Sequence, residues 1–246
     1  MSGRRVALIT GSSSGIGAAV ARRLAAEDIR IVVNSARSVA AGKELAAELP
    51  DAVYVQGDVA DASDARRIVE SAVDAYGRLD ILVNNAGATR FIPLDDLQTA
   101  DAAAWREIFD VNVFGVWQLT TAAVPHLQQS DDAVIVNISS VSATRALGSS
   151  IPYAVSKASL NHLTRLLATQ LGPRIRVNAV APGLIDTPWY DEAEEVWENS
   201  RDWITANTPL RRVGSPEDVA EAVQYLTTAA YTTGDVLTVD GGRHVV

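Results

Sequence analysis

Short apolar runs alternate with longer segments of helical periodicity along the chain of 246 residues, and this alternation limits the fold more than any other feature. The apolar runs lack polar alternation, which indicates strands buried on both faces, as in a parallel sheet covered by helices. We therefore predict an α/β fold, a doubly wound parallel β-sheet in a three-layer αβα sandwich, with a single domain over residues 1–246. Strands are expected at Val6–Thr10, Arg30–Asn34, Val53–Gln56, Asp80–Asn84, Ala133–Ile138, Arg174–Val180 and Val236–Val239. Helices are expected at Gly15–Glu27, Val39–Leu49, Asp61–Tyr76, Asp101–Leu127, Tyr153–Leu171 and Glu217–Leu226.

A glycine-rich loop, Thr10–Gly17, joins the first predicted strand to the first helix. A loop at this place is typical of a Rossmann-like fold. Its spacing is GxxxGxG. Gly11 would permit the tight turn, Gly15 would let the backbone approach a pyrophosphate, and Gly17 would allow the helix to pack closely. The exposed backbone N–H groups and the helix dipole would hold the negative charge of the pyrophosphate. Ser13, Ser14 and Ile16 are also expected to contact the cofactor. A plain flexible turn is the alternative.

The end of the second strand bears on cofactor choice. A dinucleotide site usually places an acid about 20 residues beyond the glycine loop, on the ribose 2′-hydroxyl. Residues 29–43 contain no Asp or Glu. Ser35 offers a hydroxyl instead, and Arg37 offers a charge-assisted bond to a 2′-phosphate. This favours NADP(H) over NAD(H), with a solvated surface arginine as the alternative.

Two other strand ends are expected to border the same cofactor. Asp58 and Val59 follow the third strand and would lie at the adenine ring, with a helix cap as the alternative. The fourth strand leads into Asn85, Ala86 and Gly87. The amide can bond backbone or ribose and the two small residues leave room for a ligand, unless the segment is a plain turn.

Tyr153 and Lys157 are spaced i, i+4 and therefore share one face of a predicted helix. A free phenol has a pKa of about 10, too high for a base at neutral pH. A neighbouring ammonium and an oxidised nicotinamide would both favour the phenolate, so we expect a pKa lowered by ~2–3 units and a role in proton transfer. A surface pair without chemistry is the alternative.

Polar residues at two further places in the sequence are candidates for a functional role. Hydroxyls follow the fifth strand at Ser139 and Ser140, where a serine can stabilise developing oxyanion charge. Asn112 lies inside the long helical pattern, and asparagine is a poor residue for a helix interior. We expect a local helix distortion there that exposes a carbonyl able to hold a water. A polar surface position is the alternative.

In order along the chain, these motifs resemble those of the short-chain dehydrogenase/reductase family. They are Thr10–Gly17, Asn84–Gly87, Asn112, Ser140, Tyr153 with Lys157, and Pro182-Gly183 with Thr187. Gly214–Ala220 and Gly234–Gly242 also look like the family's C-terminal part, so the resemblance covers essentially the whole chain. It implies an NAD(P)-dependent oxidoreductase that moves a hydride between a nicotinamide and a ketone or secondary alcohol. The family is commonly tetrameric, so a homotetramer is expected.

The resemblance also implies residue roles. Tyr153 would be the proton donor in reduction, and Lys157 would bind the nicotinamide ribose and lower the Tyr153 pKa. Ser140 would orient the carbonyl in preference to its neighbours Ser139 and Ser142, because it lies 13 positions before Tyr153. Asn112 would hold a water in a proton relay from Lys157. The nicotinamide would be bordered by Pro182, Gly183, Ile185 and Thr187. One departure is Ser14, where many NADP-preferring members carry a basic residue.

Composition excludes several other functions. The formal charge of −9 makes nucleic acid and anionic membranes poor partners, since an acidic protein repels phosphate. With no cysteine and three scattered histidines, we expect no disulfide and no metal site. No apolar stretch approaches 18 residues, and Val6–Ile9 is too short for a signal sequence. A cytoplasmic protein is expected.

Residues 184–210 are expected to cover the substrate, and they contain Trp189, Tyr190, Trp197 and Trp203. These aromatics either face an apolar ligand or pack the cover onto the body or a neighbouring subunit. The acidic residues of this segment are expected on a solvated helix face: Asp191, Glu192, Glu194, Glu195 and Glu198.

We expect a small or medium neutral ketone or alcohol as substrate. A 3-oxoacyl thioester on an acyl carrier protein is the alternative, and docking of that acidic carrier would need a basic patch. No Lys or Arg lies between Glu107 and Thr144, whereas Arg174 and Arg176 are available. A non-catalytic NADP(H) sensor would not need all the catalytic residues, and a methyltransferase has no use for the Tyr153/Lys157 pair.

Overall fold

Seven parallel strands form one sheet in the order β3-β2-β1-β4-β5-β6-β7. The structure is a computed structural model that describes residues 3–191 and 193–246. The strands are β1 (Val6–Ile9), β2 (Arg30–Ser35), β3 (Ala52–Gln56), β4 (Ile81–Asn84), β5 (Ala133–Ile138), β6 (Ile175–Pro182) and β7 (Val236–Val239). Every residue of β1, β4 and β5 is buried, which confirms the inference from their unbroken apolar runs. The strand order reverses between β1 and β4, the point at which such sheets bind ligands.

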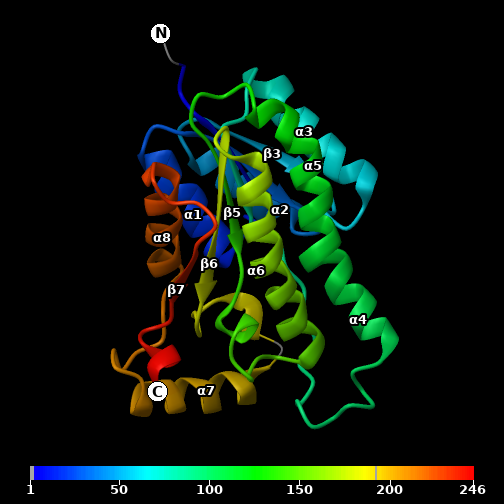
Figure 1. The fold of residues 1–246 in the computed structure, drawn as a ribbon, viewed down its shortest axis with the longest axis vertical. Helices are drawn as coiled ribbons and strands as arrows, with labels where there is room; N and C mark the ends of the chain where they lie inside the picture. Colours follow the sequence, from blue (N-terminus) through cyan, green and yellow to red (C-terminus); the bar gives the residue numbers. More distant parts are fainter. Residues whose placement is uncertain (1–2, 192) are drawn as a thin grey trace.

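Helices cover both faces of the sheet (Figure 1). One buried cluster packs α1 (Gly15–Ala26), α2 (Val39–Glu48) and α8 (Pro216–Thr228) against one face. A second packs α3 (Ala62–Tyr76), α5 (Val116–Leu127) and α6 (Ile151–Leu171) against the other. This arrangement confirms the predicted three-layer sandwich. The short helix α4 (Ala102–Phe109) precedes α5, and α7 (Glu194–Asn207) lies across the end of the molecule at which the C-terminus is found (Figure 1).

The observed elements differ from the predicted ones mainly at their ends. Helix α6 begins at Ile151 because the Ser150 hydroxyl accepts a hydrogen bond from the Tyr153 N–H and Pro152 suits the first turn. Strand β6 runs on to Pro182, since residues 179–182 pair with β7. The predicted helix over 101–127 is interrupted by a π-helical turn at Asp110–Gly115, which separates α4 from α5.

Helix α6 is fixed to β5 by buried polar side chains as well as by apolar ones. Thr164 accepts a hydrogen bond from Asn137 at 2.9 Å, and Asn161 accepts one from Ser139 at 2.6 Å. Lys157 donates to the Ile138 carbonyl at 2.8 Å. Positions 157, 161 and 164 share one helix face, so a single stripe of α6 is held against the end of β5. Each buried neutral bond contributes roughly 0.5–1.5 kcal/mol.

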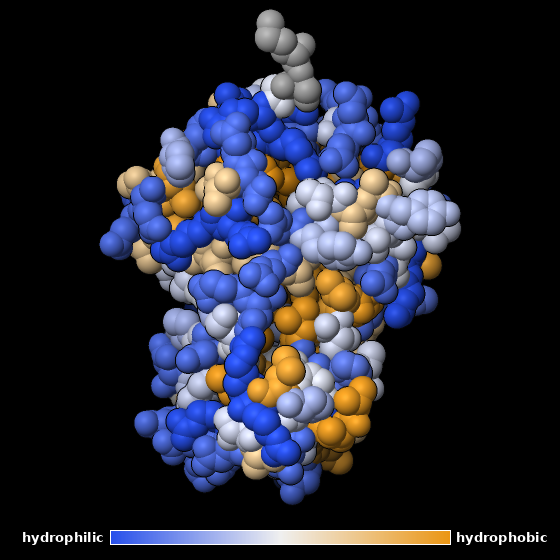
Figure 2. Space-filling view, turned by 90° about the vertical axis from the view of Figure 1, so that its left-hand side faces the viewer, coloured by the Kyte–Doolittle hydropathy of each residue, from blue (hydrophilic) through white to orange (hydrophobic). Residues whose placement is uncertain are grey.

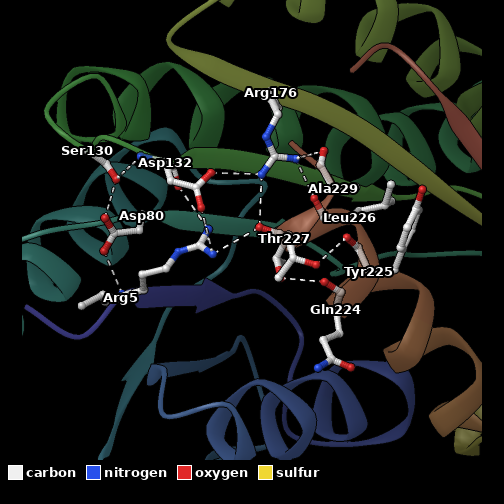
Figure 3. Close-up of polar contacts among 12 residues, drawn as sticks. Arg5, Asp80, Ser130, Asp132, Arg176, Gln224, Tyr225, Leu226, Thr227 and Ala229 are labelled. Atoms are coloured by element: carbon white, nitrogen blue, oxygen red, sulfur yellow. Dashed lines mark hydrogen bonds and ion pairs between the residues drawn. The ribbon is translucent and has the colours of Figure 1, made fainter. Parts of the chain in front are cut away.

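A polar cluster closes the opposite, amino end of the sheet (Figure 3). Arg176 donates to the carbonyls of Leu226 and Ala229 at the end of α8, at 2.7 and 3.1 Å. Its second terminal nitrogen contacts Asp132 and the Thr227 carbonyl. Cationic side chains at a helix C-terminus satisfy its last carbonyls and complement its dipole. Arg176 is therefore part of the scaffold.

The face that bears α1 and α8 is mostly hydrophilic over the sheet layers (Figure 2). Hydrophobic side chains gather lower on this face, where the molecule narrows before the segment that contains α7 (Figures 1 and 2). Among the described residues, no helix combines the length and apolarity that crossing a membrane requires.

Candidate active site

A cleft of about 750 Å³ opens at the carboxyl end of the sheet. Segments that follow β1, β2, β3, β4, β5 and β6 all contribute to its lining. Parallel strands bring their carboxyl ends to one edge, so motifs far apart in sequence meet there. The cleft is lined by most of the sequence-predicted site residues: Gly11, Ser13, Ser14, Gly15, Ile16, Ser35, Arg37, Asp58, Val59, Asn85, Ala86, Gly87, Ser140, Tyr153, Lys157, Pro182, Gly183, Ile185 and Thr187.

The glycine loop adopts backbone conformations that L side chains rarely take. Gly11 has φ +59°, and a Cβ there would lie 2.9 Å from the Ala86 Cα. Gly15 has φ +53° and faces Thr187, whose Cγ2 would be 3.3 Å from an added Cβ. Gly17, also expected among the cofactor-binding residues, does not line the cleft. A Cβ on Gly17 would lie 2.5 Å from the Asn85 Nδ2 and 2.6 Å from the Gly11 carbonyl, so this glycine lets helix and loop pack closely.

Arg37 lines the cleft beyond β2 and is exposed. Within residues 3–191 and 193–246, it forms neither an ion pair nor a side-chain hydrogen bond. Ser35 is buried and shares a 2.9 Å hydrogen bond with the Tyr54 hydroxyl. Asp58 lines the cleft, and its Oδ1 accepts the Ala60 N–H at 3.0 Å. The N-cap of α3 itself is Asp61.

The segment after β4 is held by hydrogen bonds to the glycine loop. The Asn85 amide donates to the carbonyls of Thr10 and Gly11 at 2.8 and 2.9 Å, and the Thr10 hydroxyl accepts the backbone N–H groups of Asn85 and Ala86. Asn85 therefore uses its amide on the backbone. A Cβ on Gly87 would lie 3.7 Å from the Lys157 Nζ, so the absence of a side chain keeps the approach to that ammonium open.

Tyr153 and Lys157 both point into the cleft. The Lys157 Nζ lies 5.7 Å from the centre of the Tyr153 ring and is buried, as its side chain reaches the Ile138 carbonyl. Ser140 stands across from Tyr153 at the end of β5 and accepts a 2.9 Å hydrogen bond from Ser142. Ser139 is buried and turned toward Asn161, so its hydroxyl faces away from the cleft chemistry.

Burial dominates the proton affinities of the pair. Burial raises the pKa of Tyr153, and the Tyr190 phenol raises it further, while the Ser140 hydroxyl lowers it. Burial also lowers the pKa of Lys157 to about 8. The expected lowering of the Tyr153 pKa is therefore wrong for the chain by itself, because removing the phenol from water disfavours the phenolate.

Asn112 is fully buried in the π-helical turn, so the surface alternative is wrong and the expected helix distortion is confirmed. Its Oδ1 accepts the Ala88 N–H at 2.8 Å, and its Nδ2 donates to the Ala88 carbonyl and to Ser156. Ser156 in turn donates to the Tyr153 carbonyl at 2.7 Å. Asn112 does not line the cleft. It joins the segment after β4 to the first turns of α6, and π-turns of this kind are frequent at functional sites.

The predicted cover contains a 3-10 turn, Pro188–Tyr190, followed by α7. Trp189 lines the cleft, with its ring centre 6.0 Å from that of Tyr153. Trp197 packs on Tyr190 at 5.4 Å, and Trp203 lies under the Arg243 guanidinium at 5.3 Å. Neither tryptophan is in the cleft lining: Trp197 packs within the cover, and Trp203 packs the cover against the C-terminal turn. The predicted acidic face is exposed at Asp191, Glu194, Glu195 and Glu198, and Glu192 lies outside the described residues.

Several residues of the cleft wall were not predicted from the sequence. They are Phe91, Leu94, the segment 146–149, Val196, Ser200 and Arg243. They lie in loops without a motif, on α7 or on the distant C-terminal turn, and only the fold brings them to the cleft. The glycine pair Gly241-Gly242 was the available signal for Arg243, since positive φ at both residues turns the chain there.

Comparisons with known proteins agree with this geometry. A family model described as enoyl-(acyl carrier protein) reductase matches residues 11–244. A Streptomyces violaceoruber protein named "Granaticin polyketide synthase putative ketoacyl reductase 2" is 58% identical over 241 residues, covering 98% of this chain and 96% of the relative. A 3-oxoacyl-[acyl-carrier-protein] reductase of Thermotoga maritima is 38% identical, covering 97% of each chain. The ligand-free structure of an aldohexose dehydrogenase from Thermoplasma acidophilum has a TM-score of 0.88 at 32% identity, covering 99% of this chain and 95% of that one.

Proposed function

The chain belongs to the short-chain dehydrogenase/reductase family, and from that premise we propose that it is an NADP(H)-dependent ketoacyl reductase with Tyr153 as its acid/base. The observation that carries this proposal is the convergence of Ser140, Tyr153 and Lys157 on one wall of the cleft that also contains the glycine loop. Chain similarity supports an oxidoreductase acting on ketone or alcohol groups. The ketoacyl assignment draws on the names of the relatives.

The residues present fit a nicotinamide dinucleotide. Gly11 and Gly15 leave backbone exposed where side chains would intrude, and Arg37 offers a free guanidinium at the far end of the cleft. When bound, the cofactor supplies or accepts the hydride. Ser140 would donate a hydrogen bond to the substrate carbonyl, and Tyr153 would give its proton to the oxygen that develops negative charge. Lys157 would hold the cofactor ribose and stabilise the phenolate left on Tyr153.

Asn112 is proposed to act through position. Its amide fixes Ala88 and Ser156, so it sets the distance between the segment after β4 and the turn that carries Tyr153. The π-turn frees main-chain carbonyls from the regular helical pattern, as a water in a proton relay from Lys157 would need. The residues that would border the nicotinamide, Pro182, Gly183, Ile185 and Thr187, line the cleft beside Gly15.

For the substrate, a 3-oxoacyl thioester is favoured over the small neutral ketone expected from the sequence. The 58% identity to a protein named as a ketoacyl reductase supports this choice. The sequence argument about Arg174 and Arg176 is corrected by the fold, because both lie at the amino end of β6, away from the cleft, and Arg176 is engaged with α8. A carrier protein would have to dock elsewhere. We further propose that residues 184–210 cover the bound substrate, with Trp189 as an apolar wall.

The test is NADPH oxidation with 3-oxoacyl thioesters by wild type and Tyr153→Phe. We expect kcat to fall by ~10²–10⁴-fold, because the substitution removes the only proposed proton donor and little volume. NADPH affinity should change by less than about threefold, since phenylalanine keeps the ring. Tyr225→Phe is the matched control, because Tyr225 is an exposed tyrosine on α8.

Three outcomes would contradict the proposal in whole or in part. Equal turnover in wild type and Tyr153→Phe would remove Tyr153 from the chemistry. Tight NADPH binding without turnover of thioesters, ketones or alcohols would instead indicate a sensor of the cofactor. A preference for simple ketones over 3-oxoacyl thioesters would indicate that the substrate is the small neutral ketone expected from the sequence.

A homotetramer is also proposed. Phe114 and Trp117 are about half exposed although they are large and apolar, and so is Leu166 on α6. Helices α5 and α6 lie side by side on one face of the sheet (Figure 1). Apolar patches of this kind mark protein contacts, and closed symmetric assembly of identical chains is the usual way to bury them.

A further inference from the structure

Arg243 is a cation in the cleft wall for which the proposed chemistry gives no role. It follows β7 in the C-terminal turn and lines the cleft together with Tyr190, Val196 and Ser200. Three basic residues line the cleft, and the other two already have proposed partners: Arg37 at the 2′-phosphate and Lys157 at Tyr153. Arg243 is therefore the basic residue that remains available to a substrate bound in the cleft.

The guanidinium of Arg243 is held in place but lacks an acceptor. Its Cζ stacks over the Trp203 ring at 5.3 Å, which leaves the N–H edges free. Its Nε is buried without a hydrogen-bond partner in the described part of the chain. The nearest acid in sequence, Asp240, accepts instead from the Gly242 N–H at 2.9 Å and from the His244 ring at 2.9 Å. A buried donor without an acceptor is unfavourable and suits a site completed by a ligand.

Two contacts fix the turn that carries Arg243. Arg145, between Ser140 and Tyr153 in the sequence, donates to the carbonyls of His244 and Val246, the second at 2.8 Å. The Leu210 N–H, at the end of the cover, donates to the Gly241 carbonyl at 3.1 Å. The position of Arg243 is thus tied both to the catalytic segment and to the cover.

Tyr190 links Arg243 to the proposed reaction centre. It lines the cleft together with both Tyr153 and Arg243. The described acidic residues of the cleft wall are Asp58 at the end of β3 and Glu107, which pairs with Arg90. Burial lowers the pKa of Arg243 and the nearby Asp240 charge raises it, but the two side chains form no ion pair in the described part of the chain. A substrate whose ketone meets Tyr153 would extend its chain past Tyr190 toward Arg243.

We propose that Arg243 determines substrate specificity by binding an oxygen acceptor, anionic or enolic, on the acyl chain beyond the reacting ketone. This inference rests on the proposed ketoacyl reductase function. A guanidinium presents paired N–H donors that match the two oxygens of a carboxylate, and one of these donors can also bind the single C5 oxygen of a 3,5-dioxoacyl chain. Substrates that carry such a group would gain a charge-assisted pair that a plain alkyl chain cannot make.

The test compares three N-acetylcysteamine thioesters: 3-oxohexanoyl, 3,5-dioxohexanoyl and 3-oxoglutaryl. In Arg243→Gln we expect kcat/KM for one or both oxygenated substrates to fall ~10- to 100-fold, mainly through KM, with less than about threefold change for 3-oxohexanoyl. A loss confined to the 3-oxoglutaryl thioester would indicate that Arg243 binds a carboxylate, and a loss confined to the 3,5-dioxohexanoyl thioester would indicate that it binds a diketone. Arg243→Lys should recover part of the loss. Arg66→Gln is the matched control, because Arg66 is exposed on α3.

Equal losses on all three thioesters, or none, would overturn the role of Arg243. The melting temperature and NADPH affinity of each variant separate a folding defect from a specificity change. If wild type reduces none of the thioesters, the proposed function fails. The role of Arg243 can then still be tested by calorimetry. Each oxygenated thioester is titrated into the NADPH complex of the Tyr153→Phe enzyme, and its affinity is compared with that for the same complex carrying Arg243→Gln as well. Unchanged affinity for both oxygenated thioesters would exclude it.

Discussion

Burial shifts the pKa values of Tyr153 and Lys157 in opposite directions. It raises the pKa of Tyr153 and lowers that of Lys157 to about 8. At neutral pH the chain by itself therefore holds a phenol that keeps its proton beside a lysine that is mostly charged. That is the protonation state from which Tyr153 would donate a proton in the direction of ketone reduction. Stabilisation of the phenolate then falls to Lys157, Ser140 and the bound cofactor.

Arg37 offers a direct test of cofactor preference. Arg37→Ala removes the guanidinium proposed to bind the 2′-phosphate, a charge-assisted bond worth about 1.5–3 kcal/mol. The ratio of kcat/KM for NADPH to that for NADH should therefore fall ~10- to 100-fold, with little change for NADH. Steady-state kinetics with both cofactors and one saturating ketone provide the measurement.

Arg66→Ala is the control for the general loss of a positive charge. A wild-type enzyme that prefers NADH would show that Arg37 does not bind phosphate, and so would a variant that loses both cofactors equally. Ser35 is a weaker candidate for this contact, because its hydroxyl is already paired with Tyr54.

At the level of elements, the sequence predicts the strands and most helices well because their signal is local. Strand β5 has the predicted limits, Ala133–Ile138, since a run of apolar residues buried on both faces needs no context to be recognised. The extension of β6 to Pro182 depends on its pairing with β7, which is distant in sequence. Helix α7 was expected only as an acidic face within the cover, because charged and polar residues outnumber the apolar ones in it.

The residues of the candidate site likewise differ in whether their sequence signal is local or depends on distant contacts. Motif residues that directly follow strands were predictable, because parallel strands must bring their carboxyl ends together. Arg243 was not, since its place in the cleft depends on a turn anchored by Arg145 and by the end of the cover. The effect of burial on Tyr153 was also missed, because the i, i+4 spacing to Lys157 says nothing about the loss of water around the ring.

Asp80 joins β1, β4 and the loop before β5 through one buried carboxylate (Figure 3). It accepts hydrogen bonds from the Val6 N–H at 2.9 Å, the Ser130 hydroxyl at 2.5 Å and Arg78 at 2.6 and 2.8 Å. Burial opposes ionisation, but these donors outweigh it and hold the pKa of Asp80 below its usual range. All its neighbours are donors, so an amide in its place would direct its own N–H groups at them.

We therefore expect Asp80→Asn to lower the free energy of unfolding by about 2–4 kcal/mol at pH 7, measured by urea denaturation. Because the folded pKa is depressed, the contribution of Asp80 is fully present above about pH 4 and is lost as pH falls through the folded pKa. The difference between wild type and variant should narrow below pH 4. Asp74→Asn, at an exposed position on α3, is the control. A difference that does not change with pH would contradict this account.

At the level of the whole molecule, four large apolar side chains are exposed on the helical layer that contains α5 and α6. Phe114 and Trp117 are spaced i, i+3, and Val155 and Leu166 lie eleven positions apart on α6, so each pair shares a helix face. An isolated chain of charge −9 would stay in solution, yet it would leave these rings in water. The cleft opens elsewhere, at the end of the sheet, so assembly through this layer would leave it accessible.

Trp117→Glu tests that assembly. A charge placed in an apolar contact between chains must be desolvated without a partner, so we expect a mass of four chains for wild type and of two or one for the variant by light scattering. Leu97→Glu is the control, because Leu97 is 68% exposed in the loop before α4. A tetramer that survives Trp117→Glu would show that the contact between chains uses another face. A wild-type protein that stays monomeric at all concentrations would exclude the homotetramer itself.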